Sequence, residues 1–341
     1  MGVTIEDVAR EAGVSIATVS RFINGQTVAI APATRERLQR AVDRLGYVPN
    51  AAARTLKTGR TRLIGVALAD IAHMYWSAML SGIEEGCARL GYSVVIGSAS
   101  NRSAVQSEQV ALFVRQKVDG LLLNPTEIDE ATVSRWAALR CPIVMLDRTV
   151  PGLPFPLVAV DNAYGARLAV EYLLSLGHRR IAFITWPVAN FSNRQERLDG
   201  YREALTEAGL PVDPALIRVA EESWDDGVRQ TVALFSQPNR PTAVFSANME
   251  LNLQVLAGLK QLGLRIPDDV SVVGFDDSPW DPLLDPPLTT IATPPRRLGM
   301  LAALRLCRAA ERGDHLSQRE SRLKPHLIVR RSAAPAPHSE S

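Results

Sequence analysis

Several polar side chains directly follow apolar runs that are predicted to be buried strands. Asp147 follows the run 143–146, Asn248 comes after 242–246, and Asp276 follows 270–275. Carboxylates accept hydrogen bonds, whereas amides donate and accept them, so the set suits a ligand rich in hydroxyl groups. Four of the five tryptophans lie in loops of this kind, where flat aromatic faces favour stacking on a pyranose ring. The predicted ligand-binding residues are Tyr75, Trp76, Asp147, Phe191, Asn193, Arg197, Trp224, Asn248 and Asp276.

Catalysis is the competing interpretation of the same carboxylates. The chain contains none of the patterns GxGxxG, GxxxxGK[ST], GxSxG or HExxH, and its five histidines are scattered. His178 is expected at the end of a helix rather than in a base's position. The three cysteines, Cys87, Cys141 and Cys307, have no paired spacing, so neither a disulfide framework nor a zinc site is expected. We therefore expect a binding protein and not an enzyme, with no cofactor and no metal.

A second set of side chains lies on two short predicted helices separated by Gly13. Thr4 with Asp7 forms a capping-box signal for the first helix, and Ser15 caps the second. Helical spacing turns Val19, Phe22 and Ile23 of the second helix toward a core, which leaves Ser15, Ile16, Ala17, Ser20 and Arg21 outside. Such a face fits a major groove, where an arginine pairs with guanine edges or a phosphate and apolar side chains meet thymine methyl groups.

The next predicted helices complete this small module. Pro32 opens a third helix that runs to about residue 45, and Gly46 ends it. Asn50 then caps a short alanine-rich helix that is too short to be stable alone. Its exposed Leu56, among basic side chains, suits a wedge between base steps in the minor groove. Residues 1–60 carry nine basic and five acidic side chains, an excess of four positive charges, whereas the whole chain has a net charge of +2.

From residue 63 onward, short apolar strands alternate with amphipathic helices. Strands are predicted at 63–68, 93–97, 120–124, 143–147, 180–185, 242–246 and 270–275, with helices between them. Two successive doubly wound parallel sheets imply two lobes, with ligand groups at the carboxyl ends of the strands. At 341 residues the chain is long enough for two or three domains.

The run from Val3 to Val66 resembles the headpiece and hinge of the LacI/GalR family of bacterial transcription regulators, and the resemblance continues to about residue 331. It implies an all-α helix-turn-helix headpiece joined to an α/β two-lobed domain like the periplasmic sugar-binding proteins. Ala31 departs from the family's usual serine cap, which weakens the start of the third helix by about 1 kcal/mol. The implied DNA-binding residues are Thr4, Ser15, Ile16, Ala17, Thr18, Ser20, Arg21, Asn24, Asn50, Ala53, Arg54, Leu56 and Lys57.

The resemblance also assigns domains and a mode of action. It implies a headpiece at 1–48, a hinge at 49–61, and an effector and dimerisation domain at 62–331. In that domain the first lobe comprises about 62–160 plus 292–322, and the second about 161–291 plus 323–331. A homodimeric repressor would bind a near-palindromic operator under control of a small-molecule effector. Helices near 77–90 and 298–309 are the expected dimer contacts.

Family motifs support three of the predicted effector residues. Arg197 lies in a segment similar to the family's Arg-Leu-x-Gly-Tyr motif, and Asp276 is the first acid of Gly-Phe-Asp-Asp. Asn248 matches an Ala-Asn-Asp motif, although Met249 replaces the aspartate. Phe191 disfavours a nucleobase, so a sugar is expected, with a sugar phosphate and a nucleoside left open. A plain sugar-binding protein of the same architecture is the alternative function.

Two further expectations concern the ends of the chain and its compartment. The sequence has no signal peptide and no apolar run of eighteen residues, which predicts a cytoplasmic protein that does not cross a membrane. Residues 332–341 are small, polar and proline-containing, and are expected to be disordered. They hold no heptad repeat, so a dimer is expected rather than a coiled-coil tetramer.

Overall fold

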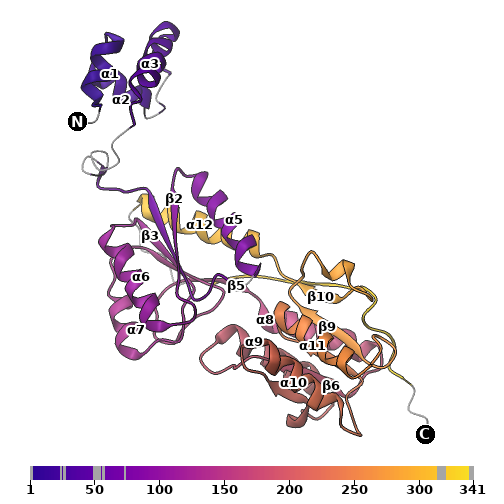
Figure 1. The fold of residues 1–341 in the computed structure, drawn as a ribbon. Coiled ribbons are helices and arrows are strands. Elements are labelled where there is room, and N and C mark those ends of the chain that lie inside the picture. The colour runs from indigo at the N-terminus through magenta and orange to yellow at the C-terminus, as the bar shows by residue number, and fades with distance from the viewer. Residues whose placement is uncertain are drawn as a thin grey trace. The chain divides into compact units, whose positions relative to one another are not determined.

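The computed structural model describes residues 3–23, 25, 28–48, 55, 58–72, 74–312 and 320–337. It comprises two compact units, residues 1–61 and residues 62–341 (Figure 1). The hinge segment around Leu56 lies almost wholly outside the described residues, so its predicted helix is not described.

The first unit is a three-helix module. Thr4 and Asp7 form the predicted capping box at the start of α1, and Gly13, at φ 63°, ends that helix in a left-handed conformation. Ala31 precedes α3 without a side-chain cap, as expected from its methyl side chain. Val8, Val19 and Leu38, one from each helix, meet in the apolar centre. The helices are α1 (Ile5–Ala12), α2 (Ile16–Ile23) and α3 (Pro32–Leu45).

The second unit contains two six-stranded sheets, one in each lobe. The sheet of the first lobe has the order β11-β5-β4-β3-β1-β2, and all its strand pairs are parallel. Its strands are β1 (Leu63–Leu68), β2 (Ser93–Ser98), β3 (Gly120–Leu123), β4 (Ile143–Leu146), β5 (Leu157–Val160) and β11 (Ser321–Leu323). Its helices are α5 (Met74–Ala88), α6 (Ser103–Arg115), α7 (Glu130–Ala137) and α12 (Pro295–Arg312).

The sheet of the second lobe repeats this plan with the order β12-β10-β9-β8-β6-β7. Only the edge strand β12 runs antiparallel to its neighbour. Its strands are β6 (Ile181–Thr185), β7 (Ile217–Val219), β8 (Ala243–Ser246), β9 (Ser271–Phe275), β10 (Thr289–Ala292) and β12 (His326–Ile328). Its helices are α8 (Asn162–Ser175), α9 (Ser192–Glu207), α10 (Trp224–Phe235) and α11 (Met249–Gln261), with short 3-10 turns at Pro214–Leu216 and Asp281–Leu283.

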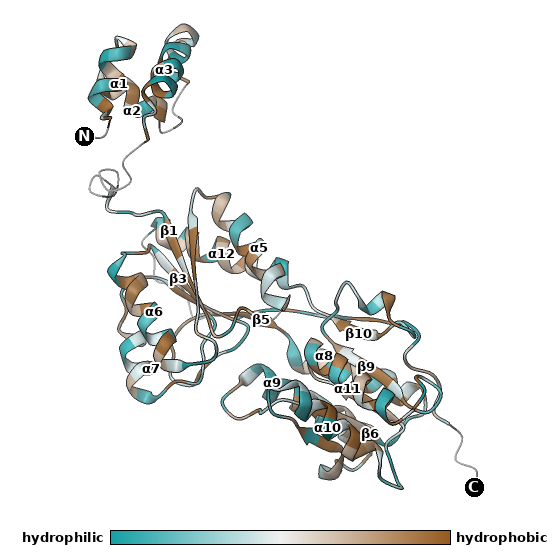
Figure 2. Ribbon diagram, in the orientation of Figure 1, coloured by the Kyte–Doolittle hydropathy of each residue, from teal (hydrophilic) through white to brown (hydrophobic). Residues whose placement is uncertain are grey.

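Both sheets are covered by helices on their two faces, as continuous apolar strands require. Every residue of β3, β4, β6, β8 and β9 is buried, and these strands are brown in the hydropathy view, whereas the helices carry both teal and brown segments (Figure 2). The strands predicted from the sequence all form, with ends that differ by at most one residue. The short strands β7, β10, β11 and β12 were not predicted, because runs of three or four residues lack a clear period.

Three segments cross between the lobes. The chain leaves the first sheet between β5 and α8, returns between β10 and α12, and crosses again between β11 and β12. The last crossing has only two residues between its strands, so Arg322 of the first sheet and His326 of the second lie close in sequence. A short crossing of this kind makes its neighbours sensitive to any change in the angle between the lobes.

Helices α5 and α12 approach each other closely on the first lobe. A Cβ added to Gly82 would lie 1.9 Å from the Arg296 carbonyl oxygen, and one added to Gly299 would lie 2.1 Å from that of Met79. The same packing places the Sγ atoms of Cys87 and Cys307 3.9 Å apart, although 220 residues separate them in the chain. The two helices in which the sequence predicted dimer contacts therefore bury one face against each other.

The prediction of a disordered tail is wrong for residues 332–336. Ser332 is fully buried, and its carbonyl oxygen accepts a hydrogen bond from the Val272 amide. Nε2–H of the buried His178 donates to the Ala334 carbonyl oxygen at 3.0 Å, and the Thr242 hydroxyl donates to Nδ1 at 2.8 Å. His178 follows helix α8 as expected, but its ring anchors this segment to the second lobe. Composition alone does not reveal such a docking site.

None of the helices in the described ranges is long and apolar enough to cross a membrane.

Candidate functional site

The outer face of α2 presents the predicted small and basic side chains. Val19 is fully buried, whereas 47% of Ile16 is exposed, and Ala17 and Arg21 are exposed as well. Ser15 starts the helix through its Oγ, which accepts from the Thr18 amide at 3.3 Å. Of the other predicted residues, Thr18 and Ser20 are half-buried and Thr4 is occupied in its capping box. The predicted DNA-binding residues Asn24, Asn50, Ala53, Arg54, Leu56 and Lys57 lie outside the described residues.

A cavity of about 120 Å³ lies between the strand ends of the two lobes. Seven of the nine predicted ligand-binding residues line it. They are Tyr75, Trp76, Asp147, Asn193, Arg197, Asn248 and Asp276. Sequence reasoning about the binding residues missed others in the lining, such as Asn124, Thr185 and Glu222. Asn124 directly follows β3 and Thr185 ends β6, so the rule of strand carboxyl ends could have found both.

Phe191 and Trp224 do not line this cavity. The ring of Phe191 lies between two guanidinium groups, 4.6 Å from that of Arg148 and 4.2 Å from that of Arg194. Trp224 is the first residue of α10, is 53% exposed, and borders a separate shallow hollow with Val228. Ser223 caps α10 by accepting from the Asp226 amide, and Trp224, in the first turn that follows, lies at the surface.

Asp147 and Asp276 occupy equivalent places in the two lobes. Asp147 directly follows β4 and Asp276 directly follows β9, and each of these strands is the fourth of its lobe in chain order. Both aspartates have a left-handed backbone conformation, with φ of 65° and 66°. Aspartate tolerates this conformation better than most residues. Tyr75 Oη donates to Asp147 Oδ1 at 3.2 Å and Asn193 Nδ2 donates to Oδ2 at 2.8 Å. The two strand ends thus point a carboxylate from each lobe into one cavity.

Burial controls the protonation of this site. It raises the pKa of Asp276, even though the Arg197 charge and a 2.7 Å hydrogen bond from Thr293 act in the opposite direction. Burial, followed by the charges of Asp147 and Asp276, raises the pKa of Tyr75 well above its usual value. Tyr75 therefore remains a protonated hydrogen-bond donor to Asp147.

Arg197 is held on three sides at the floor of the cavity. Its Nε donates to Asn162 Oδ1 at 2.9 Å and Nη1 donates to the Ala247 carbonyl oxygen at 2.6 Å. The guanidinium carbon lies 3.9 Å from the centre of the Phe275 ring. Asn248 caps α11 by accepting from the Leu251 amide at 2.9 Å, so its side-chain oxygen is already engaged. These contacts fix the fork of Arg197 before any ligand binds.

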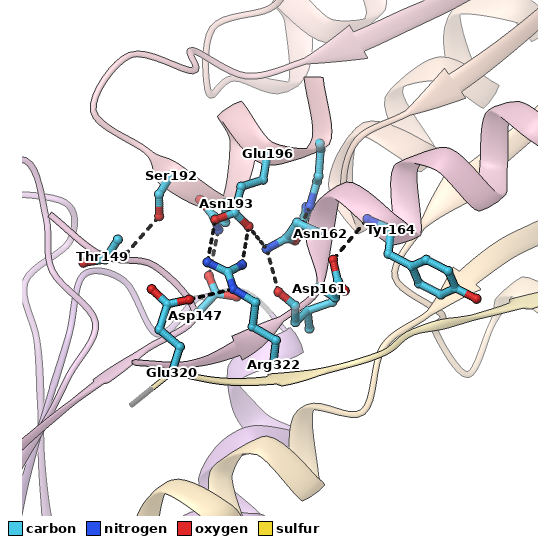
Figure 3. A network of polar contacts seen from close by, with 12 residues as sticks. Asp147, Thr149, Asp161, Asn162, Tyr164, Ser192, Asn193, Glu196, Glu320 and Arg322 are labelled. Carbon is cyan, nitrogen blue, oxygen red and sulfur yellow. Dashed lines mark hydrogen bonds and ion pairs between the residues drawn. The ribbon is translucent and has the colours of Figure 1, made fainter. Parts of the chain in front are cut away.

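A polar network joins the cavity to two of the three crossing segments (Figure 3). Asn162, at the first crossing, donates to Glu196 at 3.1 Å as well as accepting from Arg197. Glu196 accepts two hydrogen bonds, at 2.8 and 3.0 Å, from Arg322 on β11. Arg197 and Glu196 are adjacent in α9, so the network runs without a break from the cavity to β11. Asp161 and Asn162 themselves lie at the first crossing, between β5 and α8.

Direct contacts also join the two lobes across the cavity mouth. The Thr149 amide donates to Ser192 Oγ at 3.0 Å, and Asn190 donates to Glu127 at 2.6 Å (Figure 3 for the first pair). Together with the Asn193–Asp147 bond, these contacts hold the lobes against each other. A ligand that changes the angle between the lobes must form or replace such contacts.

Two family models match separate parts of the chain. Residues 4–50 match the model of bacterial regulatory proteins of the lacI family, and residues 170–333 match that of a periplasmic binding protein-like domain. Catabolite control protein A of Priestia megaterium is 32% identical over 89% of this chain and 91% of its own. The transcriptional repressor CytR of Escherichia coli K12 is 34% identical over 98% of this chain and 97% of its own.

Solved structures agree over nearly the whole length. The Lac repressor dimer bound to operator and the anti-inducer ONPF superposes with a TM-score of 0.85, at 30% identity and with 98% of this chain and 100% of that chain covered. A complex of the transcriptional regulator CelR with cellobiose gives a TM-score of 0.72, at 33% identity over 97% of this chain and 100% of its own. Relatives this similar, over this much of their length, establish that the chain belongs to the LacI family of bacterial transcription regulators.

Proposed function

We propose that this protein is a homodimeric transcriptional repressor in the cytoplasm. Each headpiece places α2 in the major groove of one half of a near-palindromic operator, and Ile16, Ala17 and Arg21 select the bases. The observation that supports this most directly is the 47% exposure of the apolar Ile16 beside exposed Ala17 and Arg21 on a helix whose inner face is buried. An exposed apolar side chain there suits contact with thymine methyl groups.

The hinge is proposed to act with the headpiece. By family resemblance, Leu56 is the wedge that enters the minor groove, with Asn50, Ala53, Arg54 and Lys57 beside it. Leu56→Ala is then expected to weaken specific operator binding by about a few kcal/mol, the energy of partial unstacking and bending. Effector affinity should remain unchanged. Equal operator affinity of this variant and the wild type would contradict the wedge.

Operator recognition can be tested without knowing the operator. Selection from random double-stranded DNA with the full-length protein should enrich a two-fold symmetric site. Arg21→Ala should then lower discrimination against mismatched sites by about 1–3 kcal/mol. Arg37→Ala, which removes an equal charge from the exposed side of α3, is the matched control and should weaken all sequences alike. If both variants lose the same affinity on selected and random DNA, Arg21 contacts phosphate only.

The cavity is the proposed effector site, and a carbohydrate is the proposed class of effector. Arg197 and Asn193 offer donors and Asp147 and Asp276 offer acceptors, a pattern suited to the hydroxyl groups of a sugar. Trp76, which is 6% exposed and edge-on to Tyr75 at 5.6 Å, supplies an apolar wall. The CelR structure with cellobiose shows that a relative with this architecture takes a sugar.

The network around Glu196 is the proposed route from effector to DNA. A ligand that moves Arg197 also moves Asn162 and Glu196, and through them Arg322 at the third crossing. A change in the lobe angle would then order or disorder the hinge. Thermal-shift screening should find a sugar that stabilises the wild type and does not stabilise Asp276→Ala, because a ligand at 100 times its Kd stabilises the native state by about 2.7 kcal/mol. A shift retained in Asp276→Ala would place the ligand elsewhere.

A further inference from the structure

Arg148 is a buried cation in the cavity wall, and among the described residues its side chain has one hydrogen-bond acceptor. It is 7% exposed, and its Nε donates to the Pro125 carbonyl oxygen at 2.6 Å. The flat face of its guanidinium packs on Phe191, 4.6 Å from the ring centre. Within the described residues, no carboxylate oxygen comes within ion-pair distance of Arg148. Its two terminal nitrogens are therefore left for a ligand in the cavity that Arg148 lines.

The carboxylates that line the cavity near Arg148 have other partners. Asp147 accepts from Tyr75 and Asn193, and Asp276 accepts from Thr293. Glu222 pairs with Arg194, with Oε1 2.6 Å from Nη2. In the part of the chain that the structure describes, Arg148 thus makes no ion pair, although it is more than nine-tenths buried.

Burial of an unpaired cation is unfavourable, and this cation shows the effect. Burial lowers the pKa of Arg148 to about 10, in spite of the favourable charge of the adjacent Asp147. A negative group bound to the terminal nitrogens would remove this penalty. Such a group would also form bidentate hydrogen bonds, because the geometry of a guanidinium matches that of a carboxylate or a phosphate.

A second cation reinforces this end of the cavity. The guanidinium carbon of Arg194 also lies over the Phe191 ring, 4.2 Å from its centre, and 5.3 Å from the centre of the Trp186 ring. Two guanidinium groups therefore pack on Phe191, and one of them, that of Arg194, is paired with Glu222. We call the part of the lining around Arg148 and Arg194 the arginine end of the cavity, and the part around Asp147 and Asp276 the aspartate end.

On this geometry, and resting on the proposed function, we infer that the effector carries an acidic group, a phosphate or a carboxylate, that binds the terminal nitrogens of Arg148. The hydroxyl groups of the same molecule face the aspartate end. Phe191, which does not line the cavity, acts as a positioning residue, because its ring supports both guanidinium groups.

The test compares matched ligands on the full-length protein. Glucose, fructose and ribose are each measured beside their phosphate esters, and gluconate and glucuronate form a third group, by thermal shift and then calorimetry. We expect at least one phosphorylated or carboxylated sugar to bind at least tenfold more tightly than its neutral parent. Binding confined to the esters identifies a phosphate, and binding confined to the acids identifies a carboxylate.

Three variants locate the acidic group. Arg148→Gln should lower the affinity for the acidic ligand at least tenfold and leave the affinity for its neutral parent within about twofold. Arg148→Lys keeps the charge but not the forked guanidinium, so its affinity for the acidic ligand should lie between those of the wild type and Arg148→Gln. Arg135→Gln, an exposed charge on α7 of the same lobe, is the matched control and should have no effect. The unliganded melting curves show whether each variant is folded.

Two results would overturn the inference and leave the proposed function standing. One is tighter binding of a neutral sugar than of all its acidic forms. The other is an equal loss of affinity for acidic and neutral ligands in Arg148→Gln, with Arg148→Lys no better. Failure of the proposed function has a different signature, since the selected operator DNA would then not be bound or would not be released by any ligand of the cavity.

Discussion

The Glu196–Arg322 pair offers a direct measurement of how firmly the third crossing is held. Arg322 binds Glu196 through both terminal nitrogens, at 2.8 and 3.0 Å, while 31% and 24% of the two side chains are exposed. Arg322→Met keeps the apolar stem, and Glu196→Gln keeps an oxygen that can accept from Asn162. Both variants should lower the free energy of unfolding of the unit 62–341.

The expected size of the coupling follows from charge separation and exposure. Two unit charges 4 Å apart attract by about 1 kcal/mol in water and about 4 kcal/mol at an effective dielectric constant of 20. Fully exposed pairs contribute about 0.2–1 kcal/mol. Because this pair is bidentate but still a quarter to a third exposed, we expect a coupling energy of about 1–2 kcal/mol. That corresponds to a change in melting temperature of about 2–4 °C.

A double-mutant cycle isolates this coupling from the other effects of each substitution. All five tryptophans lie at residue 76 or later, so tryptophan fluorescence during denaturant unfolding reports on the unit 62–341 and not on the headpiece. The exposed pair Arg265–Asp269, with 70% and 26% of the side chains exposed, is the control and should couple by less than about 0.5 kcal/mol. A Glu196–Arg322 coupling no larger than that of the control pair would refute the argument.

Three other predictions test separate parts of the structure. Burial lowers the pKa of His178 below its value in the unfolded chain, so the unfolded state takes up a proton at a higher pH than the folded state. The free energy of unfolding should therefore fall as the pH drops below about 6.5. In His178→Gln the melting temperature should depend less on pH over this range. Gly82→Ala should destabilise the unit by about 1–3 kcal/mol, because the new Cβ would meet Arg296; an unchanged melting temperature would mean that α5 and α12 separate easily. Asp276→Asn should lower effector affinity at least tenfold without lowering the melting temperature, because burial already disfavours the charged carboxylate; a clear loss of stability would show that the charge stabilises the fold.

Much of the candidate site follows from local sequence chemistry. The β4 and β9 runs and the aspartates that follow them can be recognised without a structure, because the carboxyl ends of parallel strands meet at one edge. The same holds for α1 and α2, whose capping box, glycine turn and helical spacing act within a few residues. Asn124 also directly follows a parallel strand, β3, so the same reasoning could have placed it among the predicted ligand-binding residues.

The remaining features depend on contacts between residues far apart in the chain. The aromatic character of Phe191 and Trp224 predicted a ligand contact, but packing placed one ring between two arginines and the other at the surface. The thiols of Cys87 and Cys307 meet only because glycines let α5 approach α12.

The sequence by itself determined the helices, the central strands, the exposed face of α2 and the family, since each depends on local spacing or on motifs. Only the tertiary structure decided the edge strands, the docking of residues 332–336, the Arg148 environment and the Glu196–Arg322 link. The physical reason is that short segments have weak conformational preferences of their own, so pairing with distant parts of the chain determines their structure.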